Sequence, residues 1–140
     1  MNSIARLHAL GQSVWYDNIQ RKLLQDGELA RMISEGTVRG VTSNPSIFKN
    51  AIANTHDYDA SIKTMAWAGL SSEQIFWQAA VEDIQAAADL FLPLYQETTG
   101  DDGYVSLEVN PLLAGDTQET VTQAKALWQR VNRPNLMIKI

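Results

Sequence analysis

Hydrophobic residues recur along the chain with two different spacings, and the change from one spacing to the other predicts the order of the elements. Short runs rich in strand formers, with alternating faces, predict β-strands at residues 13–17, 37–42, 104–109 and 135–140. Apolar residues three or four positions apart predict helices at residues 2–11, 19–25, 28–35, 47–53, 57–68, 71–92 and 117–131. Strands that alternate with helices in this way are parallel and joined by right-handed crossovers. We therefore predict one α/β domain over residues 1–140, with no internal boundary.

Capping residues and breakers place several helix ends. Ser46 is expected to cap the helix of residues 47–53. Pro93 is expected either to kink the longest helix or to close it, and Asp83 is the one polar residue in that helix's apolar stripe. Capping-box spacing occurs twice, in the pairs Ser71 with Gln74 and Asp116 with Glu119. The buried stripe of the last helix is predicted to be Val121, Ala124, Leu127, Trp128 and Val131.

The last predicted strand, Asn135–Ile140, has one apolar face and one face that carries a lysine. Because neighbouring residues of a strand point to opposite sides, the apolar face consists of Leu136, Ile138 and Ile140. The other face consists of Asn135, Met137 and Lys139. A desolvated lysine amine is a nucleophile towards carbonyls and forms Schiff bases. The alternative for this stretch alone is a surface-strand lysine with no chemical role.

The four strands share a further feature, a polar group near the carboxyl end. These groups are Asp17, Asn44, Glu108 and Lys139. The carboxyl ends of the strands line the active site of a parallel barrel, so four strands would direct four polar side chains at one pocket. Two acids beside a lysine could tune its amine and transfer protons. The structural alternative is that these rim residues only satisfy one another through salt bridges and hydrogen bonds.

Composition narrows the classes of function. With 140 residues, 45% of them hydrophobic and 19% charged, the chain is typical of a soluble globular domain. The net charge is −5 and no basic run is present, so we expect no nucleic-acid partner. No apolar run approaches the about 20 residues of a membrane helix, and the N-terminus lacks a secretory pattern. We therefore expect no membrane association.

The residue types also limit the chemistry. Cysteine is absent, which excludes disulfides and thiolate metal sites and is compatible with a cytoplasmic location. His8 and His56 are far apart and have no ligand spacing around them, so we expect neither a metal nor another cofactor. A reaction through a carbanion would then depend on an iminium formed from a lysine, since a metal Lewis acid is not expected.

Four segments resemble the first four strands of transaldolases, in the same order. The two most specific are Gly40–Phe48, which resembles their second-strand motif, and Asn135–Ile140, which resembles the strand with their Schiff-base lysine. Ser13–Asp17 resembles the first strand and Val105–Val109 the third. The resemblance covers the whole chain and is to the bacterial subgroup with a long insertion between strands two and three. It implies a TIM (β/α)8 barrel, of which this chain would supply about the first four strands and their helices.

The resemblance also implies a role for each polar group. Lys139 would form an imine with a ketose carbonyl, and Glu108 would carry protons through a water. Asp17 would exchange a proton with the hydroxyl next to the bond that breaks, and Asn44 would hold a hydroxyl of the dihydroxyacetone unit. The substrates would be sugar phosphates: a ketose phosphate donor (sedoheptulose 7-phosphate or fructose 6-phosphate) and an aldose phosphate acceptor (glyceraldehyde 3-phosphate or erythrose 4-phosphate). That reaction belongs to the non-oxidative pentose phosphate pathway.

The sequence departs from the family pattern in two ways. Asn110 and Leu112 occupy positions where many relatives have an acid and an arginine. The family pattern continues beyond Ile140 with four more strands, which carry the phosphate-binding groups. Because a whole barrel takes about 250 residues, we expect a fragment of a longer enzyme, or one piece of an assembly, such as a homo-oligomer, that closes the barrel. An inactive, self-associating half-barrel and a Schiff-base aldolase are the alternatives.

Overall fold

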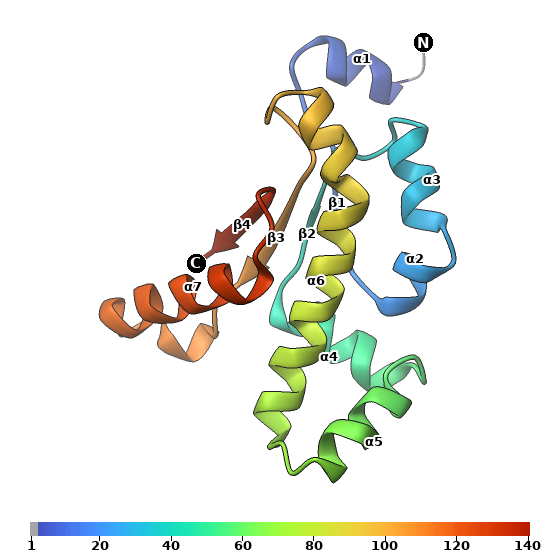
Figure 1. Ribbon diagram of the computed structural model, residues 1–140. Helices are drawn as coiled ribbons and strands as arrows, with labels where there is room; N and C mark the ends of the chain where they lie inside the picture. The colour runs from blue at the N-terminus through green and yellow to red at the C-terminus, as the bar shows by residue number, and fades with distance from the viewer. Residues whose placement is uncertain (1–2) are drawn as a thin grey trace.

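The computed structural model describes residues 3–140, where short strands and helices alternate as predicted (Figure 1). The strands are β1 (Trp15–Asp17), β2 (Gly40–Thr42), β3 (Tyr104–Glu108) and β4 (Leu136–Lys139). The helices are α1 (Ser3–Ala9), α2 (Arg21–Gln25), α3 (Glu28–Ser34), α4 (Pro45–Asn54), α5 (Asp59–Trp67), α6 (Ser72–Glu97) and α7 (Thr117–Val131), with a 3₁₀ turn η1 (Pro111–Leu113). The strands are shorter than predicted, and the predicted first residue of the first helix lies outside the described residues.

The strands form one parallel sheet in the order β1-β2-β3-β4. Asp17 pairs with Thr42, Val41 with Val105, and Glu108 with Lys139. The α/β class and the parallel arrangement are thus confirmed, whereas closure into an eight-stranded barrel stays a prediction.

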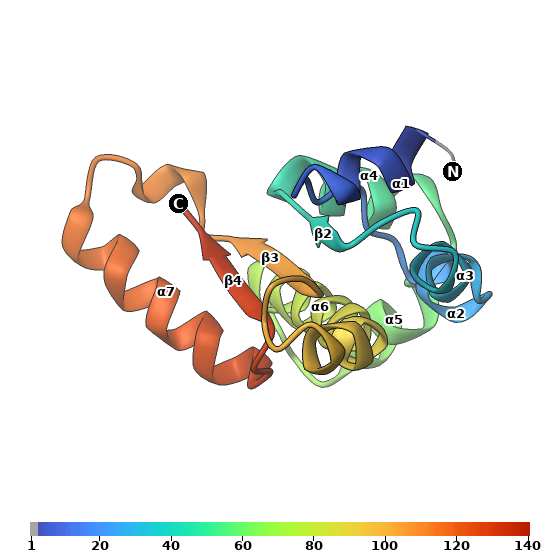
Figure 2. The same ribbon diagram turned by 90° about the horizontal axis from the view of Figure 1, so that it is seen from above.

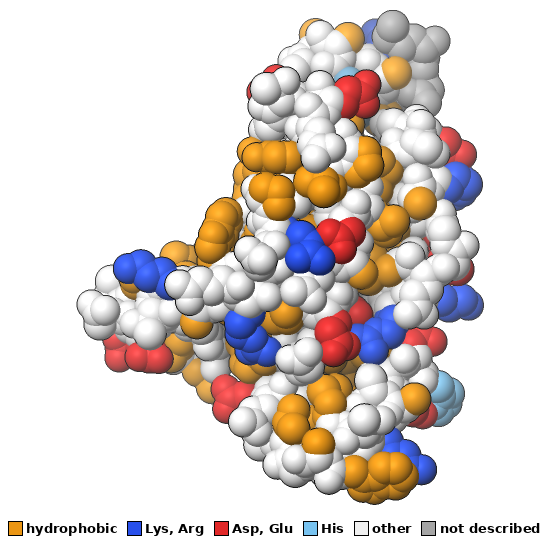
Figure 3. All heavy atoms as spheres, in the orientation of Figure 1, with side chains coloured by type: hydrophobic (Ala, Val, Ile, Leu, Met, Phe, Trp, Pro, Cys, Tyr) orange, Lys and Arg blue, Asp and Glu red, His pale blue; other side chains and the backbone are white. Residues whose placement is uncertain are grey.

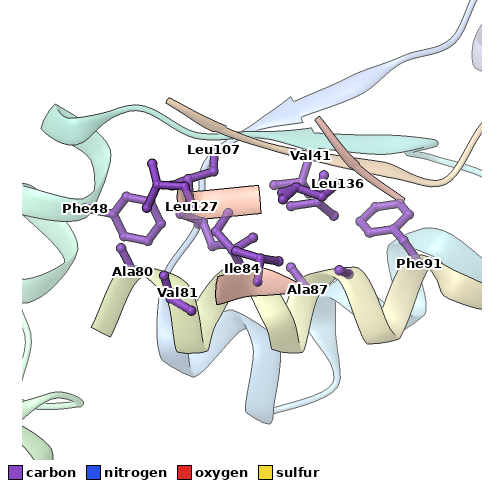
Figure 4. Close-up of a cluster of buried hydrophobic side chains, with 14 of the residues drawn as sticks. Val41, Phe48, Ala80, Val81, Ile84, Ala87, Phe91, Leu107, Leu127 and Leu136 are labelled. Atoms are coloured by element: carbon purple, nitrogen blue, oxygen red, sulfur yellow. The ribbon is translucent and has the colours of Figure 1, made fainter. Parts of the chain in front are cut away.

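One face of the sheet packs against α6, which runs along β3 (Figures 1 and 2). Figure 4 shows strand residues above Ile84 and Ala87 of α6 and beside the ring of Phe91, and all of these side chains are almost completely buried. The strand residues of this core include Val41, Val105, Leu107 and Leu136. Each large apolar side chain buried here contributes roughly 1.5–3 kcal/mol. Since strand residues alternate, packing of this face turns the polar residues of the strands away from α6.

Helix α6 begins with the predicted capping box, in which Ser71 and Gln74 bond to each other's backbone amides. The helix continues through Pro93 to Glu97, so the prediction that Pro93 could close it is wrong. Phe91 before the proline and Leu94 after it both pack on the core, and this packing holds the chain helical across the missing backbone donor.

Two predicted helix features differ in the structure. Asn44, not Ser46, caps α4: its Oδ1 accepts a hydrogen bond from the Ile47 amide at 2.9 Å. Asn44 has the extended backbone of a cap, and Pro45 fits the first helical position, where no amide donor is needed. In α7 the buried positions are Thr120, Leu127 and Val131. Val121 and Trp128 are 39% and 47% exposed, because each lies one residue, or about 100° of rotation, beyond that stripe.

The ends of the last strand also differ from the prediction. Ile140 is 82% exposed, since it lies beyond the end of β4, so it is not part of the buried apolar face. Asn135, the residue that precedes β4, is completely buried, and its Nδ2 donates to the carbonyls of Ala88 and Gly103. Asn135 therefore ties the start of β4 to α6 and to the turn before β3.

Acidic and basic side chains lie side by side on the face shown in Figure 3, rather than in a patch of one sign. Asp89 of α6 and Arg133 form an ion pair, with 2.5 Å between Oδ1 and Nε. Trp67, at the end of α5, is 79% exposed. Within residues 3–140, no helix has both the length and the apolarity required to cross a bilayer.

Candidate active site

The side-chain nitrogen of Lys139 lies among polar groups from the ends of β2 and β3. It is 2.9 Å from Oε2 of Glu108, and it donates a hydrogen bond to the Ser43 carbonyl at 2.8 Å. A longer contact of 3.4 Å reaches the hydroxyl of Thr42. The side chains of Lys139 and Glu108 are 39% and 24% exposed, so the amine is held in place yet can be reached by a solute.

The strand pleat explains why these groups meet. Residues that pair in register point to the same side of a parallel sheet, so Thr42, Ser106, Glu108 and Lys139 share the face opposite α6. Two hydrogen bonds fasten β2 to β3 beneath the lysine. Ser106 Oγ donates to Thr42 Oγ1 at 3.1 Å, and the buried Ser43 hydroxyl donates to the Ser106 carbonyl at 2.7 Å.

Asn44 lies just past β2, on the first turn of α4. Its side-chain oxygen is occupied by the Ile47 amide, so its amide nitrogen is the part that remains for a ligand. This cap fixes the orientation of the side chain, which is what a residue that positions a substrate hydroxyl requires.

Asp17 ends β1 and is exposed. Its side chain makes no hydrogen bond or ion pair with the other residues that the structure describes, and it pairs in register with Thr42. Of the four residues predicted for the site, the structure therefore brings Lys139 and Glu108 into contact. It leaves Asp17 apart and Asn44 bonded within its own helix. The catalytic roles of all four stay predictions.

Sequence reasoning missed two of the groups around the amine. Thr42 could have been found, because it is two residues before Asn44 and so lies on the same side of the predicted strand. Ser43 contributes its backbone carbonyl, and nothing in a side-chain pattern marks that atom.

A cleft lies near the same edge of the sheet but is separate from the lysine. Its volume is about 700 Å³, and Pro45, Phe76, Trp77 and Leu112 are among the residues that line it. None of the four predicted site residues contributes to its walls. Residues 3–140 contain no group of three or more His, Cys, Asp or Glu residues arranged to hold a metal ion.

The arrangement around Lys139 has the parts that amine chemistry requires. A nucleophilic amine needs an adjacent group that can accept and return protons, and the Glu108 carboxylate is within direct hydrogen-bonding distance. The fold and this site together define a parallel α/β protein with a lysine–glutamate pair at the carboxyl ends of neighbouring strands.

Comparison of the sequence with known proteins shows the family to which this chain belongs. The chain belongs to the Transaldolase/Fructose-6-phosphate aldolase family, whose sequence model matches residues 14–140. The transaldolase of Thiobacillus denitrificans is 48% identical over all 140 residues. Transaldolases of Trichodesmium erythraeum and Thermobifida fusca are 44% and 47% identical over 99% and 98% of the chain. The chain spans only 37–39% of the length of these relatives.

Proposed function

We propose that the protein containing this chain is a transaldolase that works through a Schiff base on Lys139. The observation that carries the proposal is the 2.9 Å contact between the Lys139 amine and the Glu108 carboxylate in a half-open site. Family membership and the names of the relatives support the same reaction.

In the proposed reaction the amine of Lys139 attacks the carbonyl carbon of a ketose phosphate, and loss of water gives an iminium. Glu108 transfers the protons of this step through a water molecule. Asp17 then accepts the proton of the hydroxyl on the second carbon from the iminium carbon, which allows the bond between the first and second carbons to break. That bond breaks and an aldose phosphate leaves. The electron pair of the broken bond remains on the Lys139 adduct, which becomes an enamine.

The second half of the reaction reverses these steps with a different aldehyde. The enamine attacks the acceptor aldose phosphate, Asp17 returns the proton, and hydrolysis of the new iminium frees Lys139. We assign Asn44 to a hydroxyl of the dihydroxyacetone unit, which must stay bound while the first product leaves. Holding the enamine until an acceptor arrives distinguishes a transaldolase from an aldolase.

The description of the family includes fructose 6-phosphate aldolase, so a Schiff-base aldolase is the second candidate. The discriminating experiment incubates the full-length protein with fructose 6-phosphate, with and without erythrose 4-phosphate. A transaldolase forms sedoheptulose 7-phosphate only when the acceptor is present, and without the acceptor it releases no more than one equivalent of glyceraldehyde 3-phosphate per active site. Release of free dihydroxyacetone without an acceptor, at a rate comparable to transfer, would reject transaldolase in favour of aldolase.

A further inference from the structure

A second polar cluster lies where α2, the helix that follows β1, meets α5 and α6. Arg21, the first residue of α2, extends its guanidinium into a space between α5 and α6. Its nitrogens bond to Asp83 Oδ1 at 2.9 Å, to Glu82 Oε2 at 3.0 Å and to Ser61 Oγ at 3.0 Å. A single side chain thus connects the beginning of α2 to two other helices.

Tyr58 completes the cluster from the start of α5. Its hydroxyl donates to Asp83 Oδ2 at 2.6 Å and accepts a hydrogen bond from the Arg21 backbone amide at 3.0 Å. The Arg21 guanidinium also lies over the Tyr58 ring, 4.6 Å from its centre. The side chains of Arg21 and Asp83 are 12% and 3% exposed, and Tyr58 is fully buried. Both the backbone and the side chain of Arg21 are therefore fixed.

Stability alone does not account for this cluster. Removing charged groups from water is costly, and buried ion pairs are often no more stabilising than apolar residues of the same volume. Burial raises the pKa of Asp83 even though Tyr58 and Arg21 both act to lower it. The cluster does provide a single orientation, because the planar guanidinium forks to two acids and a hydroxyl at once.

The segment that this orientation controls is short. Only Asn18, Ile19 and Gln20 separate Asp17 from Arg21, and Ile19 is completely buried. Asp17 itself has no hydrogen-bond or ion-pair partner among residues 3–140 to hold its side chain, so its position depends on the backbone on either side. On one side that backbone is β1, and on the other it is the segment anchored by Arg21.

We propose that Arg21 is a positioning residue, which holds the segment after β1 against Asp83 and Tyr58 and thereby places the Asp17 carboxylate for the carbon–carbon bond step. This inference rests on the proposed function, because it takes from it the role of Asp17. It adds Arg21 as a residue that does not contact the substrate and that affects the reaction only through Asp17.

The test is a double-mutant cycle on the full-length protein, with Arg21→Lys, Asp17→Ala and the double variant. Arg21→Lys keeps the charge but cannot reach both acids and the serine together. If Arg21 acts through Asp17, Arg21→Lys lowers kcat for transfer by roughly tenfold or more, with little change in KM. The double variant is then no slower than Asp17→Ala, and borohydride trapping on Lys139 is retained. Multiplicative losses in the double variant, or an unchanged kcat in Arg21→Lys, would overturn the proposal.

Two further variants keep the test decisive. If Arg21→Lys does not fold, the apolar pair Arg21→Met with Asp83→Leu replaces it in the same cycle, and the same two outcomes decide. Arg31→Lys is the matched control and should leave kcat unchanged, because within residues 3–140 the Arg31 guanidinium bonds only to Glu35, in an exposed pair at the end of α3. Failure of the wild-type protein to form any adduct on Lys139 would instead remove the proposed function, so the two failures are distinguishable.

Discussion

Lys139 and Glu108 are register partners on neighbouring parallel strands, and their side chains meet with 2.9 Å between Nζ and Oε2. Both positions are set by the hydrogen-bonded ladder between β3 and β4, and not by a loop. Sites built on strands hold their geometry more closely than sites built on loops. The two strands therefore set the alignment of the proposed nucleophile and its proton carrier.

Glu108→Gln should slow formation of the Lys139 adduct by a factor of roughly 10² to 10⁴, because the amide cannot accept and return a proton. The position of the adduct should not change. The measurement is the time course of borohydride-trapped adduct after mixing with fructose 6-phosphate. Glu97→Gln, on the exposed end of α6, is the control. A Glu108→Gln time course equal to that of the control would exclude Glu108 from proton transfer.

Asp17→Asn should separate the two halves of the chemistry. Without its carboxylate, the proton of the substrate hydroxyl has no acceptor, so the carbon–carbon bond should stay intact. We expect the full ketose phosphate to remain attached to Lys139, seen by mass spectrometry as a six-carbon adduct after reduction. If the variant instead accumulates the three-carbon adduct as fast as the wild type, Asp17 does not act in bond cleavage.

Tyr58 should make the protein sensitive to alkaline pH. Burial raises the pKa of Tyr58, and the hydrogen bond to Asp83 and the charge of that carboxylate raise it further. In the unfolded chain the phenol ionises near pH 10, so the folded state holds more protons above that pH. The stability contributed by Tyr58 is therefore complete below about pH 10 and is lost as the pH rises further.

Urea unfolding at a series of alkaline pH values measures this effect. The free energy of unfolding of Tyr58→Phe should fall less steeply above about pH 10 than that of the wild type. Tyr16→Phe is the control, because the Tyr16 hydroxyl lies outside the buried cluster and accepts only from Asn18. Equal slopes for the wild type and Tyr58→Phe would show that Tyr58 ionises in the folded protein.

Gly40→Ala should destabilise the sheet. A Cβ at this position would lie 2.5 Å from the indole ring of Trp15, the register partner of Gly40 on β1, so this large side chain would have to shift. Overpacking of this kind costs about 1–3 kcal/mol. Gly115→Ala is a matched control, because a Cβ there would meet nothing within 4 Å. Thermal unfolding of both variants decides: equal melting temperatures would contradict the packing described for β1 and β2.

The sequence was enough to predict the order of the elements and the position of Glu108 and Lys139 near the carboxyl ends of their strands. Both depend on the twofold period of strands and on the parallel alternation of strands and helices, which are local signals. The orientation of Asp17 could not be predicted in this way. We infer that this orientation depends on the contact between Arg21 and Asp83, which are far apart in sequence. The only sequence signal for this contact is that Asp83 is a charged residue within the apolar stripe of its helix.

The spacing of residues along the sequence also could not decide which residue caps α4. Asn44 and Ser46 are both good capping residues, and two positions separate them. The structure chooses Asn44, because Pro45 takes the first helical position and leaves Ser46 inside the helix. This choice orients the Asn44 side chain that we assign to the substrate.

The most direct test is borohydride reduction of the full-length protein in the presence of fructose 6-phosphate, followed by peptide mass spectrometry. We predict a covalent adduct on Lys139, its loss in Lys139→Met, and its retention in Lys125→Met, which removes an exposed lysine of α7. Failure to trap an adduct in the wild type, or an adduct on a different lysine, would contradict the proposed Schiff base.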